Sequence, residues 1–210
     1  MDAIGFDRAR FIGDERAAAA SLLARDATPQ GLARVAERAA NVAGEVLAHH
    51  LQVIPPNPPI ACGSGCAFCC YLRAEITMAE AERLADHLRR TRSADELAEV
   101  RARVEENASR VASLGTDARA EARIPCALLV DARCSVYEAR PLTCRGCNSS
   151  SMKDCEESLA DASVETTVYA PQTALYRYAH AALVAALSGA GADGAQRELH
   201  QALALALAAR

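Results

Sequence analysis

A chain of 210 residues is long enough for one domain, or for one domain with appendages. Hydrophobic residues make up 51% of it and aromatic residues only 4%, so the core has to consist mostly of Ala, Leu and Val, which favours closely packed helices. The formal net charge of −4 argues against nucleic acid as the main partner.

Nothing in the sequence indicates secretion or a membrane span. The first ten residues have no apolar segment behind their charges, so they are not typical of a signal peptide. No run approaches the roughly 20 apolar residues that a membrane-spanning helix needs. We therefore expect a cytoplasmic protein, in which reducing conditions disfavour structural disulfides.

The N-terminal third predicts helices. Residues 14–25 are rich in Ala, and Thr28 followed by Pro29 offers an N-cap and a proline in the first helical position. Apolar residues then recur close to helical spacing over residues 30–52. The prolines of residues 54–60 exclude a helix and predict an extended segment that leads into the first cysteines.

Two capping boxes mark the middle of the chain. Thr77 with Glu80, and Ser93 with Glu96, predict helices that end near residues 90 and 114. The pattern is a hydroxyl side chain followed three residues later by a glutamate, so that each side chain bonds the backbone N–H of the other residue.

Beyond these helices the pattern becomes irregular. Residues 115–123 are polar and predict a loop. Short apolar runs at 127–130 and 134–137 allow one small β-hairpin. The dipeptide Arg140-Pro141 then predicts the end of regular structure.

Helical signals return near the C-terminus. Residues 172–188 predict a helix that Gly189 ends, and a Gly- and Ala-rich connector over residues 189–194 precedes a last amphipathic helix over residues 195–210.

The fold class that follows is all-α, a helical bundle with an irregular cysteine-rich metal-binding insert and room for one short β-hairpin. We expect N-terminal helices in residues 1–53, the metal-binding region in residues 54–157 and C-terminal helices in residues 158–210. Together they predict one compact domain.

Nine cysteines lie between residues 62 and 155. The near ones follow the pattern C-x3-C-x2-C-C, and the far ones follow C-x7-C-x9-C-x2-C-x7-C. Clustered thiols in a cytoplasmic protein favour a metal site over a disulfide scaffold or a set of unliganded core thiols. The odd number of cysteines also fits poorly with complete disulfide pairing.

The adjacent pair Cys69-Cys70 bears on the kind of metal. Structural zinc takes four tetrahedral ligands, so eight sulfurs would make two sites, whereas an iron–sulfur cluster takes four thiolates. Successive side chains diverge and seldom reach one ion, so the pair favours two metals, a polynuclear centre, or one metal and one reactive thiol. Arginines close to the cysteines in sequence can offset the thiolate charge: they are Arg73, Arg133, Arg140 and Arg145.

Three segments together carry a family resemblance: Cys62-x3-Cys66-x2-Cys69-Cys70, then Ile124-Pro-Cys126-x-Leu128, then Cys134-Ser-Val-Tyr-Glu-Ala-Arg-Pro-Leu-Thr-Cys144-Arg-Gly. Over about residues 60–157 the chain resembles the YkgJ-type cysteine-cluster family, whose members are described as zinc- or iron-chelating. The resemblance implies seven metal-binding cysteines, and some members have an eighth at the position of Cys155: the seven are Cys62, Cys66, Cys69, Cys70, Cys126, Cys134 and Cys144. Cys147 lies outside the family pattern. Flagellin lysine N-methylases carry a similar motif on larger chains.

We therefore expect a metal-binding protein with an iron–sulfur cluster, slightly preferred, or zinc, acting in electron transfer, protein modification or metal handling. One alternative is a zinc-stabilised helical scaffold that binds a protein partner without catalysis. Another is an S-adenosylmethionine-dependent iron–sulfur enzyme, because Cys62-x3-Cys66-x-Phe68-Cys69 fits that signature, although the strand–helix alternation of a barrel is missing. The sequence assigns no catalytic residue.

Overall fold

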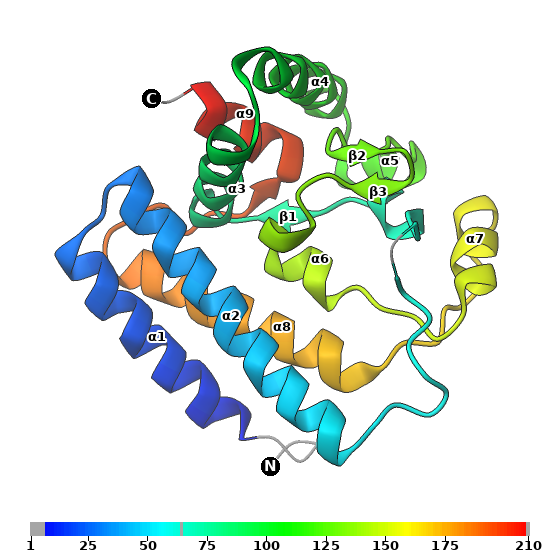
Figure 1. Cartoon of the computed structure of the whole chain (residues 1–210), viewed down its shortest axis with the longest axis horizontal. Coiled ribbons are helices and arrows are strands. Elements are labelled where there is room, and N and C mark those ends of the chain that lie inside the picture. Colours follow the sequence, from blue (N-terminus) through cyan, green and yellow to red (C-terminus); the bar gives the residue numbers. More distant parts are fainter. Residues whose placement is uncertain (1–6, 64, 209–210) are drawn as a thin grey trace.

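Two groups of helices build the fold, and the cysteine-rich segment lies beside them (Figure 1). The computed structural model describes residues 7–63 and 65–208. The first group consists of α1 (Arg8–Arg25), α2 (Pro29–Val53) and α8 (Ala170–Gly189), which pack against one another. Its core is made mainly of Ala and Leu side chains, as the composition predicts.

The start of α2 follows the predicted capping chemistry. The Thr28 hydroxyl accepts a hydrogen bond from the Gly31 N–H (3.3 Å), and Pro29 occupies the first turn, where no intrahelical donor is needed. The helix α1 begins at Arg8, earlier than expected, because Asp7 caps it by accepting from the Arg10 N–H.

The second group consists of α3 (Met78–Thr91), α4 (Ala94–Ala112) and α9 (Leu199–Ala208), with α9 packed against both of the others. Both predicted capping boxes are present at the starts of α3 and α4. This group has a hydrophobic core of its own, and α2 packs along α3 and joins the two groups. The division of the chain into regions of one compact domain stays a prediction.

Two small antiparallel sheets hold the irregular part together. β1 (Glu75–Ile76) pairs with β4 (Arg197–Glu198), so a segment that follows the first cysteines is fastened to the start of α9. β2 (Leu129–Val130) pairs with β3 (Arg133–Cys134) and confirms the predicted hairpin. The two residues of its turn, at positions 131 and 132, both have positive φ angles (49° and 57°), which matches the right-handed twist of the strands.

Some expectations about local structure were wrong. Residues 115–123 do not form a plain loop, since α5 (Thr116–Glu121) lies there, with its Arg119 buried in an ion pair with Glu198. The last helix begins at Leu199 rather than at residue 195, because the two residues before it form β4.

Regular structure also continues after Arg140-Pro141. A short helix, α6 (Leu142–Gly146), follows at once, and α7 (Met152–Ala160) begins where the Ser151 hydroxyl accepts from the Asp154 N–H. The remaining short elements are the 3₁₀ turns η1 (Phe68–Tyr71) and η2 (Tyr137–Ala139). The all-α fold class with an irregular cysteine-bearing insert and a short hairpin is confirmed.

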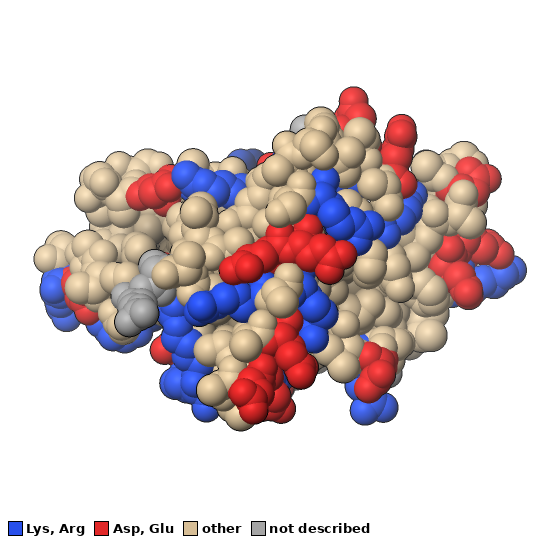
Figure 2. All heavy atoms as spheres, turned by 90° about the horizontal axis from the view of Figure 1, so that it is seen from above, with Lys and Arg blue, Asp and Glu red and all other residues tan. Residues whose placement is uncertain are grey.

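None of the helices in residues 7–63 and 65–208 combines the length and the apolar character that a membrane crossing requires. On the face shown in Figure 2, acidic and basic side chains lie interspersed.

A close approach of backbone explains one glycine of α2 and gives a test of the fold. A Cβ atom added at Gly31 would lie 2.1 Å from the Asp26 carbonyl oxygen, whereas one added at Gly44 would have its nearest neighbour at 3.7 Å, on Tyr176. We expect Gly31→Ala to lower the free energy of unfolding by about 1–3 kcal/mol. The matched control Gly44→Ala should raise it by about 0.5–1 kcal/mol. Urea unfolding followed by circular dichroism measures both, and equal effects would contradict the packing of the α1–α2 turn.

Candidate metal centre

The near cysteines lie on a tight turn followed by η1. The Cys66 N–H bonds back to the Gly63 carbonyl, and Gly65 has a φ of 92°, which other residues rarely adopt. Cys69 and Cys70 both belong to η1, where three residues make one turn. Consecutive side chains therefore leave the backbone about 120° apart, although the Cys69 and Cys70 sulfurs remain in hydrogen-bond contact.

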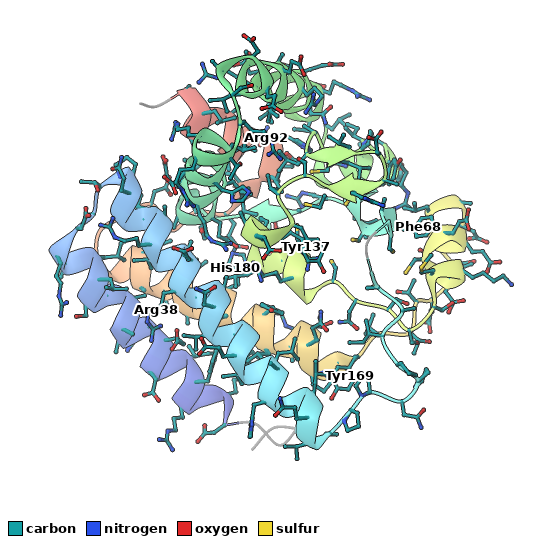
Figure 3. The ribbon with its side chains drawn as sticks, viewed as in Figure 1. Arg38, Phe68, Arg92, Tyr137, Tyr169 and His180 are labelled. Carbon is teal, nitrogen blue, oxygen red and sulfur yellow. The ribbon has the colours of Figure 1, made fainter. Side chains whose placement is uncertain are left out.

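The far cysteines return to this turn by different routes. The Cys126 N–H donates to the Cys70 carbonyl (2.8 Å), Cys134 lies in β3, and Cys144 lies in α6. Cys155 lies in α7, which packs against η1. Figure 3 shows Phe68 of η1 on the side of this region where α7 lies.

The nine thiols fall into two groups according to whether they line a cleft of about 770 Å³. Five cysteines line this cleft and are called the cleft group: Cys62, Cys66, Cys69, Cys147 and Cys155. The other four are partly buried, do not line the cleft, and are called the inner group: Cys70, Cys126, Cys134 and Cys144. The split does not follow the order of the chain, because each group takes members from both the near and the far cysteines.

The opposite wall of the cleft is formed by α8 and by the residues before α9. Thr173, Arg177 and His180 follow one another at helical spacing on the same face of α8 and line the cleft. The thiols of the cleft group therefore face a space large enough for a small organic ligand.

Contacts between sulfur atoms set the charge of the metal-free thiols. The thiols of Cys147 and Cys70 donate to the sulfur of Cys69 and hold its pKa far below the ordinary 9.0. The pKa values of the two donors rise because each gives its proton to that bond. The lowered pKa favours the thiolate form of Cys69, which contacts one thiol of each group.

Burial has the opposite effect on the inner group. It raises the pKa of the Cys126 thiol to about 12, and it raises the pKa values of Cys134 and Cys144 as well. Since a thiol has to lose its proton to bind a metal, these side chains would release protons on metal binding.

One arginine serves both groups. Burial raises the pKa values of Cys62, Cys134 and Cys144. The positive charge of the Arg140 guanidinium lowers the pKa values of the same three thiols. Its plane lies over the Tyr137 ring, with Cζ 3.8 Å from the ring centroid. Among the described side chains its buried Nε has no hydrogen-bond partner.

The other three arginines near the cysteines in sequence are exposed or have partners other than the thiols. Arg73 pairs with Glu75, Arg145 donates to backbone carbonyls of residues 138 and 140, and Arg133 is exposed. Of the four, Arg140 is therefore the one whose charge acts on the thiols.

All nine cysteines are free thiols. Soft thiolate donors suit zinc and iron–sulfur clusters, so the donor chemistry fits the expected metals. Within residues 7–63 and 65–208, no three His, Cys, Asp or Glu side chains are grouped so that they could hold a metal ion. Metal binding would have to draw the thiolates closer together.

The structure adds what spacing alone did not indicate. Cys147, which stood outside the family pattern, contacts the sulfur of Cys69 and lines the cleft with it. The sequence offered one indication of this role, because Cys147 follows the predicted ligand Cys144 after only two residues. Cys62 is held by a hydrogen bond that the Ser149 N–H donates to its sulfur (3.2 Å).

The ionisation pattern predicts a selective reaction of the metal-free protein. At about pH 5, where ordinary thiols are protonated, iodoacetamide should modify Cys69 first, because only its pKa is lowered. Replacing its donor by Cys147→Ala should raise that pKa and slow the reaction about tenfold or more. Peptide mass mapping of the alkylated protein identifies the site. Labelling spread evenly over the nine cysteines would contradict the arrangement.

The comparisons with known proteins agree with the chemistry of this region. The family model CxxCxxCC, described as "Putative zinc- or iron-chelating domain", matches residues 61–168, which is half of the chain. No curated protein and no solved structure matches the chain. The chain belongs to the CxxCxxCC, or YkgJ-type, family of cysteine-cluster domains.

Proposed function

We propose that the protein binds metal in two unequal thiolate centres, one in the inner group and one in the cleft group. The observation that carries the proposal is that Cys69 lines the cleft whereas Cys70, the next residue of the same 3₁₀ turn, does not. The proposed ligands are the eight cysteines of the family pattern: Cys62, Cys66, Cys69, Cys70, Cys126, Cys134, Cys144 and Cys155. Cys147 is a fifth thiol available to the cleft group.

The two centres would differ in role because they differ in access. Structural metal sites are closed by four protein ligands, whereas functional sites keep a position that outside molecules can reach. Four partly buried thiols make the inner group suited to a structural centre. The cleft group faces open space and holds three exposed thiols, so it suits exchange of a metal, of an electron or of a ligand: these thiols are Cys62, Cys69 and Cys147.

Iron–sulfur chemistry is our preference over zinc. A polynuclear centre uses thiolates that lie side by side, and within the cleft group the sulfurs of Cys69 and Cys147 are in contact. Electron transfer or modification of a protein in the cytoplasm is the role we propose for such a centre. A zinc-stabilised scaffold that binds a protein partner is the second candidate, and the partly buried inner group favours it.

Paired substitutions test whether the two groups are separate centres. We expect Cys126→Ser with Cys144→Ser to remove the metal of the inner group, and Cys62→Ser with Cys155→Ser to remove that of the cleft group. Each pair should therefore lose about half of the bound metal, because a centre rarely survives the loss of two thiolates. Elemental analysis and the absorption spectrum of anaerobically purified protein measure this, and each pair is the control for the other.

A broad brown absorbance would support iron–sulfur, and colourless protein with zinc would support the scaffold. Complete loss of metal from either pair would show a single shared centre. Wild-type protein without metal would overturn the proposal.

Removal of metal should affect the molecule unevenly. A chelator should take metal from the cleft group in a fast phase and from the inner group in a slow one, because only the first is accessible. Hydrogen exchange should then rise in the cysteine-bearing residues 61–76 and 124–157 far more than in the helices of the two hydrophobic cores. Mass spectrometry of peptic fragments follows the change. A uniform rise, or none, would show that the metal does not stabilise the insert.

A further inference from the structure

The backbone on either side of Cys126 is held by side chains from distant helices. The Asn107 amide of α4 donates to the Pro125 carbonyl (2.8 Å), and His200 Nε2 of α9 accepts from the Ala127 N–H (3.1 Å). The loop that carries this cysteine is therefore fixed by groups that are about 20 and 70 residues away in sequence.

A buried carboxylate orients the histidine. Because His200 Nε2 accepts a hydrogen bond from a backbone N–H, it carries no proton, so the ring proton is on Nδ1, which lies 2.9 Å from Glu198 Oε1. Arg119 of α5 donates to the same oxygen from Nε (3.2 Å) and Nη2 (3.1 Å). His200 and Arg119 are each only 2% exposed, and Glu198 is 7% exposed.

These contacts form one connected chain: Arg119 to Glu198, Glu198 to His200, and His200 to the N–H that follows Cys126. Its geometry resembles the carboxylate–histidine pairs that stand behind metal ligands, where the carboxylate fixes the tautomer and the ring position. Here the histidine holds the backbone of a candidate ligand instead of binding the metal itself. It is a positioning group.

We infer that Arg119, Glu198 and His200 act as a clamp that positions Cys126 for metal in the inner group. This inference rests on the proposed function. It makes α9 part of the inner centre although that helix supplies no thiolate. It also explains why a segment so rich in apolar residues begins with a buried Glu and a buried His.

The first experiment measures release of metal to a chelator from protein purified anaerobically. His200→Leu fills the same space without an acceptor, and it should speed the slow phase about tenfold or more while leaving the fast phase unchanged. His200→Gln keeps an oxygen that can accept from Ala127 and should restore most of the wild-type rate. His49→Leu, at an exposed position of α2, is the matched control and should change neither phase.

A second measurement does not depend on metal. In the metal-free protein, His200→Leu should raise the hydrogen exchange of the Ala127 amide and the alkylation rate of Cys126 relative to wild type. If wild-type protein holds no metal, the proposed function fails while this measurement still tests the clamp.

Wild-type exchange at Ala127 and an unchanged slow phase in His200→Leu would overturn the inference, as would equal acceleration of both phases. Where His200→Leu does not fold, Glu198→Gln is measured in its place and should speed the slow phase more weakly. If both variants unfold, the three residues support the whole fold instead of positioning one cysteine, and the inference is wrong.

Discussion

Irregular backbone has to satisfy its own hydrogen-bonding groups, and in this protein the helices supply the partners. Among the described residues, the cysteine-bearing segments between α2 and α3 and between α5 and α8 contain only short helices and two-residue strands in which carbonyl and amide groups could pair. Side chains from the second helix group reach into it instead. Glu80 of α3 accepts from the Leu142 N–H, and Arg92 donates to the Ser135 carbonyl. Loss of one such partner leaves a buried polar group unpaired, which costs about 1–3 kcal/mol.

This constraint explains why the cysteines gather from far apart in sequence. Two of the far cysteines lie on segments that hydrogen bonds fasten to the segment of the near cysteines. Cys126 is bonded to the carbonyl of Cys70, and Thr143, next to Cys144, donates to the carbonyl of Glu75. The two hydrophobic cores thus provide a rigid frame, while the thiols lie on segments that can adjust when metal draws them together.

The electrostatic environment differs between the two sides of the cysteine cluster. The Cys69 thiolate lies at the junction of the two groups, and the Arg140 guanidinium acts on thiols of both. The cation–π contact with the Tyr137 ring adds to the interactions that hold this positive charge in place. The side of the cluster that faces the cleft is therefore the accessible side, and it carries the one cysteine whose pKa is lowered, Cys69.

Much of this molecule follows from local sequence. The capping boxes at Thr77 and Ser93, the N-cap at Thr28 and the hairpin before Cys134 depend on residues within a few positions of one another, and all were predicted. The family and its metal chemistry follow from the spacing of the cysteines, because that spacing can be read directly from the sequence.

What the sequence could not determine depends on contacts between distant residues. The short helices α5 and α6 are too weak to form alone, and they exist because groups such as Glu198 and Glu80 bind them from elsewhere. The same holds for the site. Composition and spacing predicted a cysteine-cluster region with the chemistry of a soft-metal site. Only the tertiary structure decided which thiols face the cleft, which lie inside, and that His200 stands behind Cys126, because these relations arise where separate segments pack together.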